Sequence, residues 1–136
     1  MNKTHVVKEK KPNWHFIDAE NQTLGRLASD IAKLLIGKHK ENFSYRVNVG
    51  DKVVVTNTSK LRVTGNKLKD KKYRWHTGYP GGLKEESLEG LLSRNPERVI
   101  EQAVKGMLPK NKLQRERMRN LYVYAGPTHP HMAQEK

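Results

Sequence analysis

The chain contains no cysteine. This absence excludes a disulfide framework, a thiolate zinc site and a catalytic thiol, and it favours a reducing compartment. No stretch approaches the roughly 18 consecutive apolar residues of a membrane span, so we expect no contact with a membrane. Residues 1–12 carry four lysines but no apolar segment of a secretion signal, and we expect a flexible basic N-terminal arm there.

Recognisable catalytic motifs are also missing. No serine lies in a nucleophile-elbow context, and no phosphate-binding or dinucleotide-binding glycine pattern follows a predicted strand. Asp18 and Asp51 flank predicted strands, where an α/β site can form, but a turn-forming role is favoured for both. Pro130 separates His129 from His131 and further ligands are lacking, so we predict no metal site. We therefore expect no enzyme, no cofactor and no small-molecule substrate.

Acidic residues are scarce relative to basic ones. The chain has 27 Lys and Arg against 14 Asp and Glu, a net charge of +13, which is typical of proteins that bind a polyanion. The charge is uneven, because residues 85–101 hold five glutamates whereas residues 105–119 hold six basic residues and one glutamate. We therefore expect one acidic face that points to solvent and at least one basic surface.

Residues 65–84 form the most distinctive segment. They combine six Lys or Arg residues, four glycines and the rings of Tyr73, Trp75, His76 and Tyr79. Cations attract a phosphate backbone, flat rings stack on unpaired bases, and glycines permit close approach of the main chain. This combination favours RNA binding, and the alternative is a charged hairpin that is merely solvated.

Periodicity predicts an α/β fold of ordinary single-domain size. We expect strands at residues 14–18, 53–55 and 121–124, and shorter ones at 61–65 and 73–76. A helix from Thr23 to Gly37 joins the first two strands, and Ser87, Asn95-Pro96 and Lys112 begin further helices. The buried β-branched run at 53–55 indicates a parallel sheet with helices on both faces.

Short blocks distributed from Trp14 to His131 carry a resemblance beyond composition. In order they are Asp18-Ala19, Thr23-Leu24-Gly25-Arg26-Leu27-Ala28, Gly37-Lys38, Val63-Thr64-Gly65-Asn66-Lys67, Tyr73, His76-Thr77-Gly78-Tyr79-Pro80-Gly81-Gly82, Asn95-Pro96-Glu97, Ala103-Val104-Lys105-Gly106-Met107-Leu108-Pro109, Leu121-Tyr122-Val123-Tyr124-Ala125-Gly126 and His129-Pro130-His131. With these blocks the chain resembles the bacterial form of the ribosomal protein L13 family. It departs from the family pattern at Asn48-Val49 and at Gln114, where a glycine is usual.

The resemblance implies a three-layer α/β/α domain over residues 1–136, with a four-stranded, mostly parallel sheet, basic loop extensions and an extended C-terminal tail at residues 127–136. It implies a structural role in the large ribosomal subunit, early in assembly, with 23S-type large-subunit rRNA and neighbouring ribosomal proteins as partners. It implies no catalysis, no cofactor and no independent homo-oligomer, and it favours a cytoplasmic ribosome over an organellar one.

The family's RNA-facing segments correspond here to the connector at 38–46, the segment at 66–84 and residues 105–119. Within them we predict these RNA-binding residues: Lys38, His39, Lys40, Arg46, Lys67, Lys69, Lys71, Lys72, Arg74, His76, Tyr79, Lys84, Lys105, Lys110, Lys112, Arg115, Arg117 and Arg119. Two other functions stay open from the residues alone. They are a free-standing RNA-binding regulator that uses the same surfaces, and an RNA-processing enzyme that uses Asp18 or Asp51.

Overall fold

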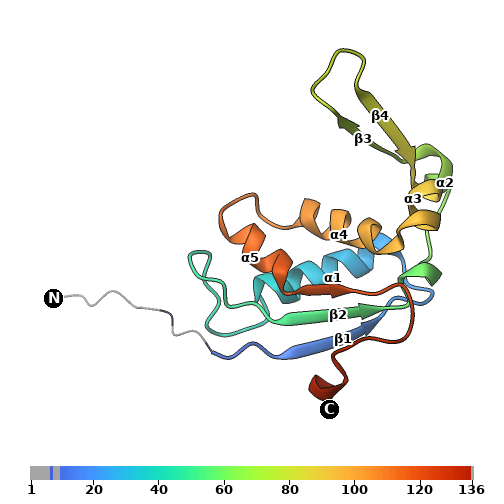
Figure 1. Ribbon diagram of the computed structural model, residues 1–136. Coiled ribbons are helices and arrows are strands. Elements are labelled where there is room, and N and C mark those ends of the chain that lie inside the picture. Colours follow the sequence, from blue (N-terminus) through green and yellow to red (C-terminus); the bar gives the residue numbers. More distant parts are fainter. Residues whose placement is uncertain (1–6, 8–9, 136) are drawn as a thin grey trace.

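A three-stranded parallel sheet forms the centre of the protein (Figure 1). The structure is a computed structural model and describes residue 7 and residues 10–135, so most of the predicted N-terminal arm lies outside the described residues. The strands are β1 (Trp14–Asp18), β2 (Lys52–Thr56) and β5 (Leu121–Val123), in the order β1-β2-β5. The β-branched run in β2 therefore occupies the central strand, as its sequence predicted.

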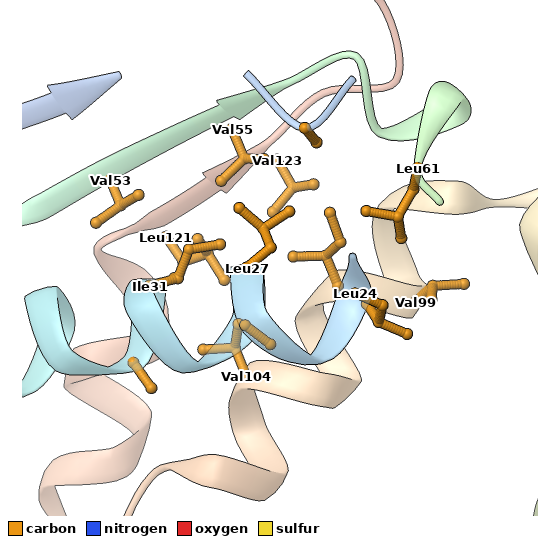
Figure 2. Packing of buried hydrophobic residues seen from close by; sticks show 14 of the residues in the cluster. Leu24, Leu27, Ile31, Val53, Val55, Leu61, Val99, Val104, Leu121 and Val123 are labelled. Carbon is orange, nitrogen blue, oxygen red and sulfur yellow. The ribbon is translucent and has the colours of Figure 1, made fainter. Parts of the chain in front are cut away.

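One face of the sheet packs against three helices. These are α1 (Leu24–Ile36), α4 (Pro96–Met107) and α5 (Leu113–Arg119). Alternation along the strands directs Val53, Val55, Leu121 and Val123 toward these helices, where they meet the apolar stripe of α1 (Figure 2). The helical spacing of apolar residues in α1 and α4 thus produces the buried core.

The opposite face is covered by the C-terminal segment instead of a second layer of α-helices. Trp14 and Tyr122 project there as neighbouring rings, 5.6 Å between centroids, and the ring of His131 lies over both. Phe16 and His129 make a similar contact at 5.4 Å. The prediction of helices on both faces was therefore wrong for the described residues. Residues 127–135 fold back over the sheet and include a short 3₁₀ turn, Met132–Gln134.

The prediction of a fourth sheet strand at residues 61–65 was also wrong. Arg62 forms only an isolated bridge with Thr23, next to a 3₁₀ turn at Thr58–Lys60. The amide of Arg62 donates to the carbonyl of Gln22, and the amide of Leu24 donates to the carbonyl of Arg62. The segment that contains Thr23 turns into α1 at Leu24. The pairing with Arg62 therefore cannot extend into a β-ladder.

Residues 72–87 form a separate antiparallel hairpin that stands away from the sheet (Figure 1). Its strands are β3 (Lys72–His76) and β4 (Leu83–Ser87), and only β3 was predicted. The polar sequence of β4 carries no strand signal, since only Tyr73 of β3 packs against the core from the described strands of this hairpin. Two short helices, α2 (Lys67–Asp70) and α3 (Leu88–Arg94), connect the hairpin to the rest of the fold.

Several helix boundaries follow the sequence signals. The Ser87 hydroxyl accepts a hydrogen bond from the Gly90 amide at 3.2 Å, and the Asn95 side chain accepts one from the Arg98 amide at 3.4 Å. Gly37 ends α1 in the left-handed conformation, φ 86°. Thr23 precedes α1 as predicted, but its hydroxyl does not cap the helix. Among the described residues we find no helix both long and apolar enough to cross a membrane.

Candidate nucleic-acid interface

The hairpin presents cations and rings to solvent on both of its strands. Tyr79, in the connecting loop, is 75% exposed, and Trp75 on β3 is 46% exposed. Around them lie the exposed side chains of Lys67, Lys69, Lys71, Lys72, Arg74, His76 and Lys84. The structure thus gathers into one projecting element most of the residues predicted from the 66–84 segment.

Glutamates of β4 neutralise part of this charge. The Nε of Arg74 donates to Glu85 at 3.0 Å, and the Nζ of Lys72 lies 3.7 Å from the same carboxylate. Such exposed pairs are weak and are screened by salt, so a phosphate can replace the glutamate. Lys67, Lys69 and Lys84 form no ion pair within the part of the chain that the structure describes.

The orientation of His76 is fixed locally. Its Nδ1 accepts a hydrogen bond from the Gly78 amide at 2.9 Å, and Gly78 adopts a left-handed φ of 87°. This bond leaves the Nε2 edge of the exposed ring directed away from its own loop. His76 can therefore anchor its own loop and also offer a ring edge to a ligand.

A second cationic surface lies along α4 and α5. Arg98, Lys105, Lys112 and Arg115 line a hollow between the two helices. Lys110 and Arg119 are exposed beside it. Arg115 and Arg119, four residues apart, lie on the same face of α5. The side chain of Gln114 donates to the Lys105 carbonyl at 2.9 Å, so the residue that replaces the usual glycine ties α5 to the end of α4.

Arg117 does not belong to this surface, and its prediction as an RNA-binding residue was wrong. It is 1% exposed, because position 117 falls on the face of α5 that packs against the fold. Its Nε and Nη2 are buried and find no hydrogen-bond partner among the described residues. Burial lowers the pKa of this guanidinium, while the charge of Glu116 opposes that shift. Counting basic residues along α5 could not distinguish the inward side chain from its outward neighbours.

The connector at 38–46 is only partly available to a ligand. Lys38 and Arg46 are exposed, and so is the ring of Tyr45. His39 and Lys40 instead bind the buried carboxylate of Asp51: the His39 Nε2 lies 2.8 Å from Oδ2, and the Lys40 ammonium pairs with Oδ1. The prediction that Lys40 faces RNA is therefore corrected, since its charge is already paired inside the molecule.

Asp51 is the centre of a small polar network. Besides His39 and Lys40, it accepts hydrogen bonds from the His15 Nε2 at 2.8 Å and the Asn13 amide at 3.0 Å. Burial alone would raise the pKa of this carboxyl, but the four donors, Lys40 first, outweigh it and hold the pKa at about 2. The predicted turn-forming role of Asp51 was incomplete, because nothing in the sequence indicated that His15 would lie opposite it.

This network is also where a metal ion would find ligands. Atoms of His15, His39 and Asp51 lie within 4.8 Å of one another. The Lys40 ammonium, however, already neutralises the carboxylate, and a divalent cation there would meet an adjacent positive charge. We therefore assign the network a structural role, joining β1, the connector and the start of β2.

Asp18 forms the turn that its sequence predicted. Its Oδ1 accepts hydrogen bonds from the Glu20 amide at 2.9 Å and the Asn57 side chain at 3.0 Å, which lower its pKa. His131 bonds the Tyr124 hydroxyl at 2.8 Å while its ring stacks on the sheet. Asp18, Tyr124 and His131 thus serve the fold, and none of them points a free acid or base into a cleft.

The fold and its exposed charges together define a basic α/β protein with two cationic surfaces, one of them interleaved with aromatic rings. Proteins with this combination typically bind nucleic acid. The profile of the family described as Ribosomal protein L13 matches residues 12–130. The chain belongs to this family.

Bacterial members of the family align over nearly the whole chain. A large ribosomal subunit protein uL13 of Thermus thermophilus is 57% identical over 132 residues, 97% of this chain and 94% of the relative. The protein of the same name from Symbiobacterium thermophilum is 51% identical and covers 99% of this chain and 96% of its own length. That of Teredinibacter turnerae is 57% identical over 92% and 88%, respectively.

Proposed function

We propose that this chain is a structural constituent of the large ribosomal subunit that binds large-subunit, 23S-type rRNA. The observation that carries the proposal is that one packed α/β body bears two cationic surfaces, one on the hairpin and one along α4 and α5. A body of this kind holds the surfaces at a fixed distance, so the RNA segments bound to them are held apart at that distance too. The protein thereby stabilises one fold of the RNA, and it performs no catalysis.

The hairpin supplies the first contact. Lys67, Lys69, Lys71 and Lys84 neutralise phosphates, and Lys72 and Arg74 do so after exchanging Glu85 for a phosphate. Tyr79 and Trp75 offer exposed rings on which unpaired bases stack. His76 holds the loop through Gly78 and donates from its free edge.

The α4–α5 surface supplies the second contact. Its cations are Lys105, Lys110, Lys112, Arg115 and Arg119, all exposed. Arg115 can bind a phosphate through two parallel N–H groups, which fixes direction as well as charge. The connector extends the cationic area through Lys38, His39 and Arg46. His39 acts through its Nδ1 edge, because its Nε2 is bound to Asp51.

The remaining partners follow from the family. We propose neighbouring large-subunit proteins as further contacts, entry at an early stage of subunit assembly, and a cytoplasmic bacterial-type ribosome as the location. The proposal needs only one domain, residues 1–136, without self-association.

Fractionation of a cell lysate on a sucrose gradient tests the proposal. The chain should sediment with the large subunit at low salt and stay there after a high-salt wash. A triple variant, Lys67→Gln with Lys69→Gln and Lys84→Gln, should leave the subunit at lower salt than the wild type. The matched control, Lys33→Gln with Lys60→Gln, removes two lysines that are not among the cations of either surface and that pair with Asp30 and Glu20, and it should behave as the wild type. If the chain stays free at the top of the gradient at both salt concentrations, it would instead be a free-standing RNA-binding regulator.

A further inference from the structure

Three segments that are distant in the sequence converge on one groove. It is bounded by the start of α1, by residues 63–67 leading into α2, and by the end of α4, and its volume is about 870 Å³. Thr23, Gly25, Gly65, Lys67, Gly106 and Met107 are among the residues that line it. Each segment belongs to a block that carries the family resemblance, yet neither cationic surface described above accounts for it.

Two helical glycines in this groove face open space. Gly25 and Gly106 lie in α1 and α4 without a left-handed φ, and a Cβ placed on either would meet no other part of the described chain within 4 Å beyond its own helix backbone and chain neighbours. Gly50 shows the contrast, since a Cβ there would lie 1.7 Å from the Leu35 carbonyl oxygen. Glycine is unfavourable inside a helix. A glycine also permits the close approach of another backbone, and no part of the described chain makes that approach to Gly25 or Gly106.

Charge identifies the kind of partner. Lys67 and Lys71 line the groove against a single acid, Asp70, and Lys105 flanks it on α4. Gln102 borders this groove, the hollow between α4 and α5, and the depression beside β3. The groove is therefore continuous with both cationic surfaces and carries the same sign of charge.

We propose that the groove receives a ribose–phosphate strand of RNA, whose sugars pack directly on Gly25 and Gly106. This proposal rests on the proposed function and deepens it by locating a third, close contact. Lys67 and Lys71 lie where phosphates enter, and the exposed Met107 side chain offers a soft apolar surface to a sugar. The Thr23 hydroxyl, which does not cap α1, and the Gln102 amide are positioned to bond 2′-hydroxyls.

The experiment enlarges Gly106 in the full-length chain and measures binding to protein-free large-subunit rRNA. Gly106→Ala and Gly106→Leu should keep or raise the temperature of thermal unfolding, because both residues favour the helix more than glycine does. Binding should weaken with side-chain size, by roughly tenfold or more for leucine, the scale of an overpacked contact. Gly25→Ala should also weaken binding. Gly90→Ala in α3 is the matched control, since that helical glycine has room for a methyl group and lies outside the groove.

The outcomes separate the two proposals. If the wild type binds rRNA and Gly106→Leu binds it equally well, the groove is not an RNA site and only this inference fails. Normal rRNA binding by Gly106→Leu, combined with poor incorporation into large subunits, would assign the groove to a protein neighbour and would also overturn it. If the wild type itself does not bind rRNA, the proposed function fails and the groove proposal falls with it.

Discussion

At the scale of single residues, the buried carboxylate of Asp51 is the most consequential polar group. It joins three parts of the chain through Asn13, His15, His39 and Lys40, and it is fully buried. A buried charge is tolerated only where its partners replace the lost hydration. The connector, with the cations it carries, is therefore held in place by this residue.

The pH dependence of stability should report this network. The Asp51 pKa falls from its ordinary 3.8 to about 2 on folding, so its contribution is fully present above pH 3.8 and is lost as the pH falls toward 2. The difference in unfolding free energy between the wild type and Asp51→Asn should shrink by about 2 kcal/mol across that window. Urea denaturation at a series of pH values measures it. Asp30→Asn, which removes an exposed ion pair, is the control and should change stability little at any pH.

Removal of the buried charge of Arg117 should affect stability in the opposite direction to removal of the Asp51 charge. Because two of its N–H-bearing nitrogens are buried without acceptors, replacing it with an apolar residue of similar length should stabilise the protein. We expect Arg117→Met to raise the free energy of unfolding by about 1–2 kcal/mol in denaturant titrations. The same variant should bind rRNA as the wild type does, whereas Arg115→Gln and Arg119→Gln should bind more weakly. A loss of rRNA affinity in Arg117→Met at unchanged stability would return this residue to the interface.

At the scale of elements, the passage from α1 into β2 depends on one close contact. The Asp51 amide donates to the Leu34 carbonyl at 3.1 Å, and this brings Gly50 against the end of α1. Gly50 does not need a left-handed φ, so its role is to leave space and not to permit a turn. The sequence predicted only that the adjacent Asp51 would form a turn.

Gly50→Ala should consequently destabilise the protein by about 3 kcal/mol, because its methyl group would overlap the Leu35 carbonyl. The comparison is with Gly126→Ala, which has open space around its Cβ and should change stability little. Thermal unfolding of both variants measures the difference. Equal unfolding temperatures would mean that the connector moves freely relative to α1.

At the scale of the whole molecule, the net charge of +13 is concentrated on surfaces that the core does not need. The packed centre is built mainly from apolar residues of α1, α3, α4 and the sheet, whereas the exposed lysines of the hairpin and of residues 105–112 contribute little to it. Binding and folding are therefore separable properties, and variants of these lysines should fold normally.

The salt dependence of rRNA binding tests how the charge acts. If the two surfaces neutralise about six to ten phosphates, affinity should fall by on the order of 10³-fold or more when salt rises a few-fold. Filter binding at several salt concentrations gives the slope. The triple variant Lys67→Gln, Lys69→Gln, Lys84→Gln should reduce that slope by about 2–3, since each lost phosphate contact contributes slightly less than one. A weak salt dependence of the wild type would contradict the two-surface clamp.

The sequence by itself determined the elements and the sign of the binding surface. Apolar periodicity located α1 and α4, the valine run located β2, and the capping residues Ser87 and Asn95 located two helix starts. The excess of basic residues indicated a polyanion partner. These features are local in the chain, so local patterns of polarity are sufficient to reveal them.

Only the tertiary structure decided which basic residues face outward and what lies across the chain from each segment. It placed Arg117 inside and Arg115 outside, and it brought His15 and Lys40 onto Asp51. It also reduced the predicted fourth sheet strand to a single bridge at Arg62, paired β3 with β4 in a separate hairpin, covered one sheet face with the C-terminal segment, and assembled the glycine-lined groove. Each of these depends on contacts between residues far apart in sequence, and the pattern within one segment does not specify its partner.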